Sequence, residues 1–534
     1  MTGTGKRAAV LHPFLFSLFP ILALYAHNIK SIPVPLKELA VPMALSLAAT
    51  AVLFLLFSAV FRPPAKAGFV ASLVVLWVLS FGHLAGWIAV WTGGIFNRSL
   101  FFATAILVGL TAYIAGRSRR DFDNLSRVLN VVSVMLVLLN AASVAQTLAR
   151  RTHSRPENAV SATRRAAVRP NIYYIVLDAY TRADILEEVF SFDNAPFLSA
   201  LEARGFLVAD RSYSNYNLTH QSLASSLNFA LLDRMARDVG YSSSDREPLY
   251  AMIRENRAMA FLRSQGYRII TVSSSLEPTD FRSADRYFGF ARSDSEFRSV
   301  LLNTTPWPLF FESRRSTESY DAHRARILNA FAALEESAAE KGPFFMFVHI
   351  MAPHPPFVFG ANGEPVEPDY LFSMVDADRL HGGNAAALPD YIVRYRAQLA
   401  FLNTKILGTI DLILAGSPEP PIIVLQGDHG SRTYTDFDRP EASYFKENLA
   451  ILNAYHLPGD GPALVYPSIS PVNTFRLIFK HYLGADLDLV EDRSFWTTWR
   501  RPYRFLPFDE TRYEATVGSV KAVMSPEAPA IQKR

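Results

Sequence analysis

Long apolar stretches crowd the first part of this chain, and no other feature of the sequence restricts its fold as strongly. Hydrophobic residues make up 50% of the 534 positions, and the excess is concentrated before residue 150. A helix needs about 20 apolar residues to cross a bilayer, and little polar sequence is present here to cover buried helices in water. We therefore expect a transmembrane domain of about five helices over residues 1–148. The expected spans are residues 10–26, 39–61, 68–91, 100–115 and 125–148.

Positive charge in the short loops predicts the orientation of these helices. Lys6 and Arg7 precede the first stretch, which looks like a secretory signal, but further spans follow and no convincing cleavage site is present, so we expect a retained anchor. More positive charges lie between spans two and three and between spans four and five. The positive-inside rule then places the N-terminus inside and the chain beyond span five outside. This predicts a multi-pass protein of a bacterial inner or cell membrane, with its C-terminal domain on the periplasmic or extracellular side.

The composition of residues 149–169 predicts a basic linker, which complicates this orientation. Six arginines follow span five on the predicted outer side, although long translocated domains weaken the charge rule. These arginines either face solvent or contact anionic headgroups, where each would contribute about 1 kcal/mol. The chain has no cysteine, which excludes disulfides, thiolate metal sites and a cysteine nucleophile. It also lacks a basic stripe interleaved with aromatic residues, so we expect no nucleic-acid partner.

Beyond the linker, strand-like and helical patterns alternate, which favours a mostly parallel sheet with helices on both faces. We expect an α/β domain over residues 170–515 and a disordered tail over residues 516–534. A Gly-, Pro- and Asp-rich excursion over residues 360–390 is a candidate substrate lid. The expected strands are residues 172–177, 267–273, 344–349 and 422–426, and the expected helices are residues 195–204, 221–228, 248–265, 320–341 and 391–414.

The most informative local motif is GDHG, which ends the apolar run 422–425. A buried strand would deliver the Asp428 carboxylate and the His429 imidazole together at its carboxyl end. In open α/β sheets, ligands bind just outside the carboxyl ends of the strands, and Asp and His on one tight turn can reach a single divalent cation. By itself, the motif is equally compatible with an ordinary surface turn.

Two further segments carry candidate site residues. The run 172–177 is apolar on both faces, as in a central parallel strand, and it ends at Asp178, which is either a second metal ligand or the N-cap of a following helix. Thr219 precedes a plausible helix of small residues over 221–227. Its hydroxyl is either a simple N-cap or a nucleophile, placed where backbone N–H groups favour phosphate oxygens.

The order of these segments resembles that of the alkaline phosphatase and sulfatase superfamily. The likeness spans about residues 168–495 and is greater to the membrane-anchored branch, which includes lipoteichoic acid synthases and lipid A phosphoethanolamine transferases. It implies an alkaline phosphatase-like fold and one or two divalent metal ions (Mn, Zn, Mg or Ca), with Thr219 as the nucleophile. The metal ligands would be Asp178, Thr219, Asp428 and His429. The first acid of that branch is usually Glu, so Asp178, with its shorter side chain, is a departure.

A fourth segment contains two histidines. The strand-like run 344–348 leads to His349, and His354 follows it. In the transferases that the chain resembles, a histidine after this strand contacts the substrate phosphate or assists the leaving group, and histidine is able to do both near neutral pH. The prolines after His354 favour an extended loop that suits a segment facing a site. His349 is equally well explained as a buried, hydrogen-bonded histidine.

Together these features predict a metal-dependent, membrane-bound phospho-group transferase or phosphodiesterase acting on lipid- or glycan-linked phosphate. The metal would lower the pKa of the Thr219 hydroxyl, and Thr219 would attack the phosphodiester. His349 or His354 would protonate the leaving group, and water or a glycan hydroxyl would resolve the phospho-threonine. A membrane anchor suits a lipid substrate, because tethering raises the effective concentration of that substrate at the site.

Two alternatives compete with this prediction. Sulfatases that resemble the superfamily use an oxidised Cys or Ser in a C/S-x-P-x-R motif, whereas the segment here is LTHQS, without that motif. Ser222, the last residue of this segment, is an alternative nucleophile. The non-enzyme alternative is a membrane scaffold that kept the fold but lost turnover. Metal content and phosphodiester turnover would separate these possibilities.

Overall fold

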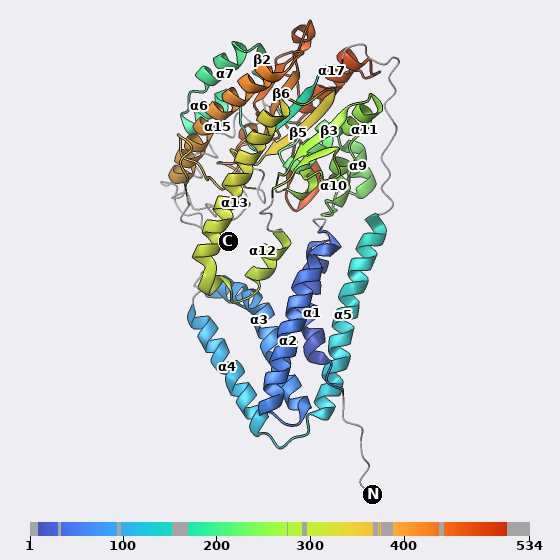
Figure 1. Cartoon of the computed structure of the whole chain (residues 1–534), viewed down its shortest axis with the longest axis vertical. Coiled ribbons are helices and arrows are strands. Elements are labelled where there is room, and N and C mark those ends of the chain that lie inside the picture. The colour runs from blue at the N-terminus through green and yellow to red at the C-terminus, as the bar shows by residue number, and fades with distance from the viewer. Residues whose placement is uncertain are drawn as a thin grey trace. The chain divides into compact units, whose positions relative to one another are not determined.

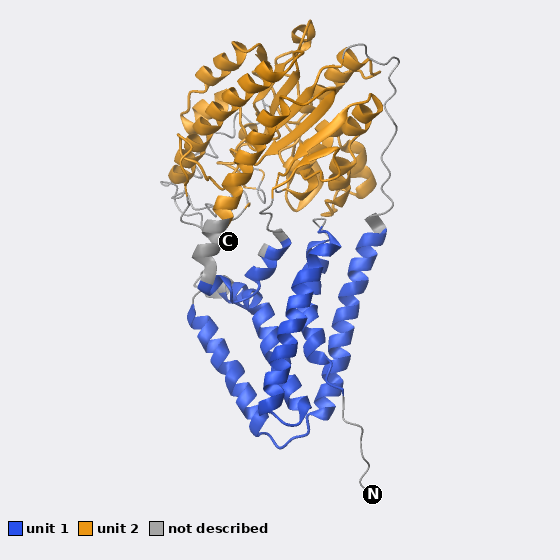
Figure 2. Ribbon diagram, viewed as in Figure 1, with its two compact units in different colours: residues 1–153, 294–315 blue, residues 154–293, 316–534 orange. Residues whose placement is uncertain are grey.

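The computed structural model divides the chain into two compact units, which are described separately (Figures 1 and 2). Unit 1 contains residues 1–153 and 294–315, and unit 2 contains residues 154–293 and 316–534. The residues that the structure describes are 9–29, 34–92, 98–151, 169–274, 276–290, 296–366, 372, 374, 388–436, 440 and 443–509. The predicted tail, most of the linker and most of the candidate lid lie outside the described residues.

Unit 1 is built on the five apolar N-terminal helices that the sequence predicts. Helices α2 to α5 are long and apolar enough to cross a membrane, whereas α1 has 17 residues, at the lower end of the length that suffices. The short helix η1, Leu36–Leu39, leads into α2. The five helices are α1, His12–Asn28; α2, Ala40–Val60; α3, Pro64–Thr92; α4, Arg98–Arg117; and α5, Asp123–Arg151.

A segment from the C-terminal half of the sequence also belongs to unit 1 (Figure 2). It includes α12, Glu296–Asn303, and the start of α13, Pro308–Ser337. The ring of Phe297 packs edge-on against Tyr25 at 5.6 Å, and the ring of Phe310 packs against Phe101 at 5.1 Å. The domain boundaries expected from sequence did not assign residues 294–315 to the transmembrane domain, and those boundaries stay a prediction.

Unit 2 contains a seven-stranded, mostly parallel mixed sheet in the order β2-β7-β6-β1-β5-β3-β4, so the predicted fold class is confirmed. The central strands are rich in β-branched and aromatic residues and are buried on both faces. Strands β4, β3, β5, β1 and β6 run parallel to one another. Strand β7 runs in the opposite direction, and β2 pairs antiparallel with β7, so β2 runs in the same direction as the five parallel strands. The strands are β1, Ile172–Leu177; β2, Phe206–Val208; β3, Arg268–Val272; β4, Arg286–Phe288; β5, Phe344–Ile350; β6, Ile422–Gly427; and β7, Asn453–His456. A separate antiparallel pair is formed by β8, Phe495–Thr498, and β9, Arg501–Pro507.

Helices cover both faces of the sheet (Figure 1). The sequence predicts one helix over residues 248–265, but the structure has two, because Asn256 caps a new helix by accepting a hydrogen bond from Met259 N at 2.8 Å. The helices are α6, Ala183–Phe190; α7, Ala195–Glu202; α8, Thr219–Asn228; α9, Asp233–Val239; α10, Glu247–Arg254; α11, Arg257–Ser264; α13; α15, Leu388–Gly416; α16, Phe445–Leu449; and α17, Pro471–Leu483.

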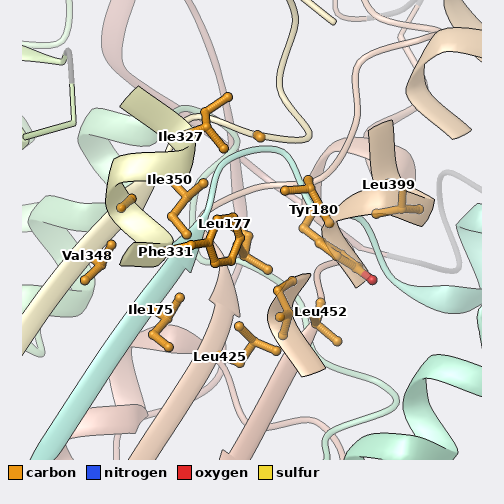
Figure 3. Close-up of a cluster of buried hydrophobic side chains, with 14 of the residues drawn as sticks. Ile175, Leu177, Tyr180, Ile327, Phe331, Val348, Ile350, Leu399, Leu425 and Leu452 are labelled. Atoms are coloured by element: carbon orange, nitrogen blue, oxygen red, sulfur yellow. The ribbon is translucent and has the colours of Figure 1, made fainter. Parts of the chain in front are cut away.

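The core of unit 2 lies between the sheet and helices α13 and α15 (Figure 3). Ile175 and Leu177 on β1 belong to the same buried cluster as Phe331 of α13 and Leu399 of α15, and Leu399 lies near Tyr180. By length and composition α15 is also apolar enough to span a membrane. Its apolar stripe is buried in the core, however, and Val393 on its outer side is 62% exposed, which is the pattern of an amphipathic helix in a water-soluble domain.

Cysteine labelling can test this distinction, because the natural chain has no cysteine. We expect Val393→Cys in α15 to react with a membrane-impermeant maleimide in membranes that expose the unit 2 side. Leu107→Cys in α4 is equally exposed in the structure, at 63%, but we expect it to react only after denaturation, because lipid covers it. Labelling of both cysteines in intact membranes would contradict a lipid-facing α4, and protection of both would contradict the core assignment of α15.

Candidate active site

The register of three parallel strands brings the candidate site residues to one edge of the sheet. Leu177, the last residue of β1, is level with Ile350 of β5 and with Gly427 of β6. Asp178 and Asp428 follow directly after two of these positions. All of these strands point the same way, so their carboxyl ends meet at the edge where α/β sheets bind ligands.

Four of the predicted side chains converge at this edge. The Nε2 atom of His349 lies 3.3 Å from Oδ2 of Asp178. The Nε2 atom of His429 lies 3.4 Å from Oδ1 of Asp178 and 3.5 Å from Oδ2 of Asp428. All four side chains are almost fully buried. The GDHG segment is therefore not a surface turn, and α6 begins at Ala183, so Asp178 is not its N-cap.

Among the residues that the structure describes, three atoms of this cluster are buried without a hydrogen-bond partner: Asp178 Oδ1, Asp428 Oδ2 and His349 Nε2. One ligand atom from each residue can be chosen so that all three lie within 4.8 Å of one another. Leaving such groups unsatisfied is costly, and native proteins do so rarely. Buried carboxylates and an imidazole that converge in this way form a group that could hold a metal ion.

The electrostatics of the cluster favour the protonation states that bind metals. Burial by itself raises the pKa of Asp178, but His354, His349 and His429 outweigh it and hold that pKa well below its usual range. Burial, reinforced by the charge of Arg432, lowers the pKa of His429. At neutral pH Asp178 is therefore a carboxylate and His429 a neutral imidazole, as a metal ligand must be.

Thr219 also reaches the cluster. It is the first residue of α8, whose N-cap position is held by Leu218, so the hydroxyl is not a simple N-cap. Instead, Oγ1 of Thr219 lies 3.2 Å from Nε2 of His429. The alternative nucleophile Ser222 is buried, and its hydroxyl contacts Ser214 at 3.1 Å. The geometry therefore brings Thr219, and not Ser222, to His429.

A strained turn aims Asp178 into the site. The next residue, Ala179, has φ of 63°, a left-handed conformation that is uncommon and costly for a residue with a side chain. Two hydrogen bonds hold it there. Its N–H donates to Asp428 Oδ1 at 3.2 Å, and its carbonyl accepts from the Tyr395 hydroxyl at 2.9 Å. The same turn therefore fixes both acids relative to each other.

His354 lies beside these groups. Its backbone N–H donates to the Asp178 carbonyl at 3.0 Å, and its ring centroid is 6.5 Å from that of His429. Its Nδ1 contacts the carbonyl of Pro355. The structure thus brings together all six predicted site residues. The buried group that could hold a metal contains His349, however, which the sequence predicts as a catalytic residue rather than as a ligand.

Sequence reasoning missed Arg432. One guanidinium nitrogen, NH2, lies 2.8 Å from Nε2 of His429 and donates to the Asn217 carbonyl at 3.1 Å. Its side chain is almost fully buried, so a fixed positive charge stands beside the Thr219 hydroxyl. Arg432 follows His429 by three residues in GDHGSR, but no local pattern shows that its side chain turns back to His429.

Glu447 was also missed, and it organises the loop after His429. Its buried carboxylate accepts hydrogen bonds from Ser431 Oγ at 2.7 Å, Thr433 N at 2.6 Å and Tyr434 N at 2.9 Å. Burial raises its pKa, which these hydrogen bonds partly offset. Glu447 lies in α16, and nothing in the local sequence indicates that it folds back on this loop.

The family of the chain follows from comparison with known proteins. Residues 170–467 match the sulfatase family. The chain belongs to the sulfatase family. The membership in the alkaline phosphatase superfamily that the sequence predicts is therefore confirmed. No curated protein matches the sequence.

Several solved structures are similar to unit 2 of this sulfatase-family protein. The C-terminal periplasmic domain of EptC from Escherichia coli is 13% identical, with a TM-score of 0.44 over 68% of this chain and 99% of that one. The soluble domain of lipooligosaccharide phosphoethanolamine transferase A from Neisseria meningitidis is 12% identical, with a TM-score of 0.37 over 61% and 92%. BT1596, a 2-O GAG sulfatase, is 14% identical, with a TM-score of 0.38 over 63% and 74%.

Gly430 offers a test of how tightly the loop after His429 is built. A Cβ at this position would lie 2.0 Å from the Glu447 carbonyl and 2.7 Å from that of Ala450. We expect Gly430→Ala to lower the free energy of unfolding by about 1–3 kcal/mol, because backbone must shift to admit the methyl group. Gly408→Ala in α15 is the matched control, because a Cβ added there would lie within 4 Å of no described atom outside its own helix backbone. We expect this variant to raise the free energy of unfolding by up to about 1 kcal/mol. Denaturant unfolding in detergent measures both, and an equal effect of the two variants would contradict the packing described here.

Proposed function

We propose that this protein is a metal-dependent, membrane-bound enzyme that transfers a phospho-group, or cleaves a phosphodiester, on a lipid- or glycan-linked substrate. Thr219 is the proposed nucleophile. The observation that carries the proposal is the buried convergence of Asp178, Asp428 and His429 on a point beside the Thr219 hydroxyl. A hydroxyl, carboxylates and imidazoles in one place are the components of metal-assisted phosphoryl transfer.

The spacing of these atoms suits a divalent metal ion. Ligands about 2.0–2.1 Å from a tetrahedral zinc ion lie about 3.3 Å from one another. The distances from His429 Nε2 to Thr219, Asp178 and Asp428 are 3.2, 3.4 and 3.5 Å. Asp178, Asp428, His429 and Thr219 are the proposed ligands, and His349 is at the same spacing from Asp178. When bound, the metal would acidify the Thr219 hydroxyl and neutralise charge on the substrate.

Protein side chains would provide the nucleophile, the stabilisation of negative charge and the proton for the leaving group. Thr219 is only partly buried, so a substrate can reach its hydroxyl from outside. In this proposal the Thr219 hydroxyl gives its proton to water, and its oxygen attacks phosphorus as the bond from phosphorus to the alcohol oxygen breaks. The Arg432 guanidinium, once it turns from His429, balances the negative charge of the non-bridging oxygens. His354 or His349 donates a proton to the departing alcohol oxygen. Water or an acceptor hydroxyl then releases the group from Thr219.

The family also contains sulfatases, so hydrolysis of a sulfate ester is the second candidate function. The nucleophile segment disfavours it, because Thr219 stands in LTHQS, without the Cys or Ser and the Pro-x-Arg of the sulfatase motif. The inactive-scaffold alternative is disfavoured by the three unsatisfied buried atoms, since a site without function has no reason to retain their cost.

The membrane context supports a lipid-linked substrate. Unit 1 carries helices of membrane-spanning length, and the positive charges in its short loops favour an outer position for the chain after α5. A catalytic domain tethered to the membrane meets lipid-linked groups at a raised effective concentration. We propose that the site acts at the outer face of a cell membrane.

Intact mass spectrometry tests the nucleophile. The full-length protein in detergent, loaded with Mn²⁺ or Zn²⁺, is incubated with a phospholipid mixture. We expect a covalent adduct on the wild type and on Ser222→Ala, and none on Thr219→Ala, because only the Thr219 hydroxyl reaches His429. The mass of the adduct would name the transferred group. An adduct that survives in Thr219→Ala but disappears in Ser222→Ala would contradict the assignment.

Metal content tests the proposed ligands. We expect elemental analysis to find one or two divalent ions per wild-type chain. Asp428→Asn should lose at least one of them, because the substitution removes a charged ligand at the centre of the cluster. Asp233→Asn, at a partly exposed position near Arg493, is the control and should keep the full complement. A wild type without metal after loading would favour the scaffold alternative.

A further inference from the structure

The sequence of unit 2 is interrupted by residues 294–315, which belong to unit 1 (Figure 2). Within this segment, residues 299–311 form the run SVLLNTTPWPLFF, which has no charged side chain. An uncharged, largely apolar run of this length is too short to cross a bilayer, and it is typical of a core helix or of a segment that enters the membrane and returns. In the structure the run covers the end of α12, a turn and the start of α13.

The turn between α12 and α13 packs against the apolar part of α3, not against the end of that helix. The Gly82 N–H donates to the Thr304 carbonyl at 2.7 Å. A Cβ at Gly82 would lie 2.1 Å from the Asn303 carbonyl oxygen, so a side chain there would block this approach. Gly82 is six residues before Ile88, where the apolar span of α3 ends, which places it about 9 Å inside the span at 1.5 Å per residue. The turn therefore reaches into the membrane-spanning part of unit 1.

Two polar contacts show from which side the segment enters. Arg298 forms an ion pair with Glu38 of η1 at 3.3 Å, and the Arg98 Nε at the start of α4 donates to the Leu309 carbonyl at 3.1 Å. Because successive spans alternate in direction, η1 and the start of α4 lie on the side of the membrane where α5 ends. The segment therefore enters from the side on which the chain continues into unit 2.

The backbone of the turn suits an apolar environment. Each N–H group of residues 304–310 is hydrogen-bonded, and the two prolines in this stretch have none to satisfy. The Thr304 and Thr305 hydroxyls donate to backbone carbonyls of α12 at 2.7 and 2.6 Å. Non-helical backbone is tolerated at membrane depth only where its polar groups are satisfied in this way.

The two sides of the segment differ in their exposure. Leu301, Thr304 and Leu309 are buried. Four apolar side chains are between 37% and 47% exposed: Val300, Leu302, Trp307 and Phe310. Their patch continues onto α4, because the ring of Phe310 contacts Phe101, which in turn contacts Phe102, a residue 55% exposed on that helix. Contiguous exposed apolar patches mark interaction sites, and tryptophan is enriched where a bilayer meets water.

We propose that residues 299–311 form a re-entrant segment that inserts into the bilayer, so that Val300, Leu302, Trp307 and Phe310 contact lipid. The occupant of this surface is lipid, because the patch is continuous with the exposed apolar face of α4 and the turn lies at the depth of the α3 span. The protein would thus contact the membrane through a segment inside the sequence of its catalytic domain, in addition to its five N-terminal helices. The inference rests on unit 1 alone and goes beyond the proposed function.

Fluorescence quenching of the full-length protein in lipid nanodiscs tests the proposal. The natural chain has no cysteine, so Trp307→Cys can carry a single bimane fluorophore. We expect lipids with brominated acyl chains to quench it as strongly as they quench Leu107→Cys on α4, and aqueous iodide to quench it weakly. Val393→Cys on α15, where the natural residue is exposed to the same degree as Leu107, should show the opposite pattern. Phe310→Cys is a second position and should behave as Trp307→Cys does.

Gly82→Ala tests the packing of the segment on α3. We expect this change, made in labelled Trp307→Cys, to weaken quenching by lipid and to strengthen quenching by iodide, because the methyl group would displace the turn. Gly86→Ala, one turn further along α3, is the matched control, since a Cβ there would meet no described atom within 4 Å outside its own helix. Unchanged lipid quenching of Leu107→Cys in the Gly82→Ala background would show that the spans are still inserted.

Three results would overturn the proposal. Quenching of Trp307→Cys and Phe310→Cys by iodide alone would place the segment in water. Protection of both positions from both quenchers would mean that protein, such as a second copy of the chain, covers the patch. Lipid quenching that is the same in Gly82→Ala and Gly86→Ala would contradict insertion through packing on α3.

Discussion

The alignment of β1 with β5 and β6 is the constraint on which the rest of the site depends. Because Leu177, Ile350 and Gly427 are level, Asp178 and Asp428, which follow two of these residues, and His349, which precedes the third, reach the same edge of the sheet without any long loop. The strands themselves are buried on both faces, so their register is fixed by packing and cannot slip without moving polar groups into the core. The site is as rigid as the sheet that carries it.

This rigidity allows the fold to hold an arrangement that is unfavourable by itself. The two acids and two histidines of the cluster are almost fully buried, and Ala179 adopts a left-handed backbone conformation that is unfavourable for a residue with a side chain. The surrounding hydrogen bonds from Tyr395 and the Glu447 loop keep these groups in place. A ligand that binds only the folded state would recover part of this cost, and the proposed metal ion would be such a ligand.

Much of the site could be predicted from sequence, because strands that are apolar on both faces mark where a parallel sheet ends. Asp178 and Asp428 were singled out in this way and Thr219 by its position before a helix, and the structure brings the three residues close to His429, although their roles stay predictions. The roles of Arg432 and Glu447 depend on contacts between segments that are distant in sequence or on the direction of a side chain, and no local pattern encodes either. The N-cap alternative at Asp178 and at Thr219 was removed only by where α6 and α8 begin, and the metal-ligand and nucleophile roles stay predictions.

The sequence left three assignments open: the environment of α15, the unit to which residues 294–315 belong, and the histidine that could hold a metal. The amphipathic pattern of α15 is apolar enough to resemble a membrane span, and only its packing against the sheet identifies it as a core helix. The segment 294–315 belongs to unit 1, although its uncharged run is too short to be identified as a membrane span from sequence. His349 is part of the buried group that could hold a metal, whereas the resemblance pointed to His429, and both lie at ligand spacing from Asp178.

The most direct test of the central claim is an anomalous difference map from crystals of the full-length protein grown with Zn²⁺ or Mn²⁺. We expect a strong peak between the carboxylates of Asp178 and Asp428, within bonding distance of His429 or His349 and adjacent to the Thr219 hydroxyl. Ordered carboxylates with no peak between them, or a peak only at other residues, would contradict it.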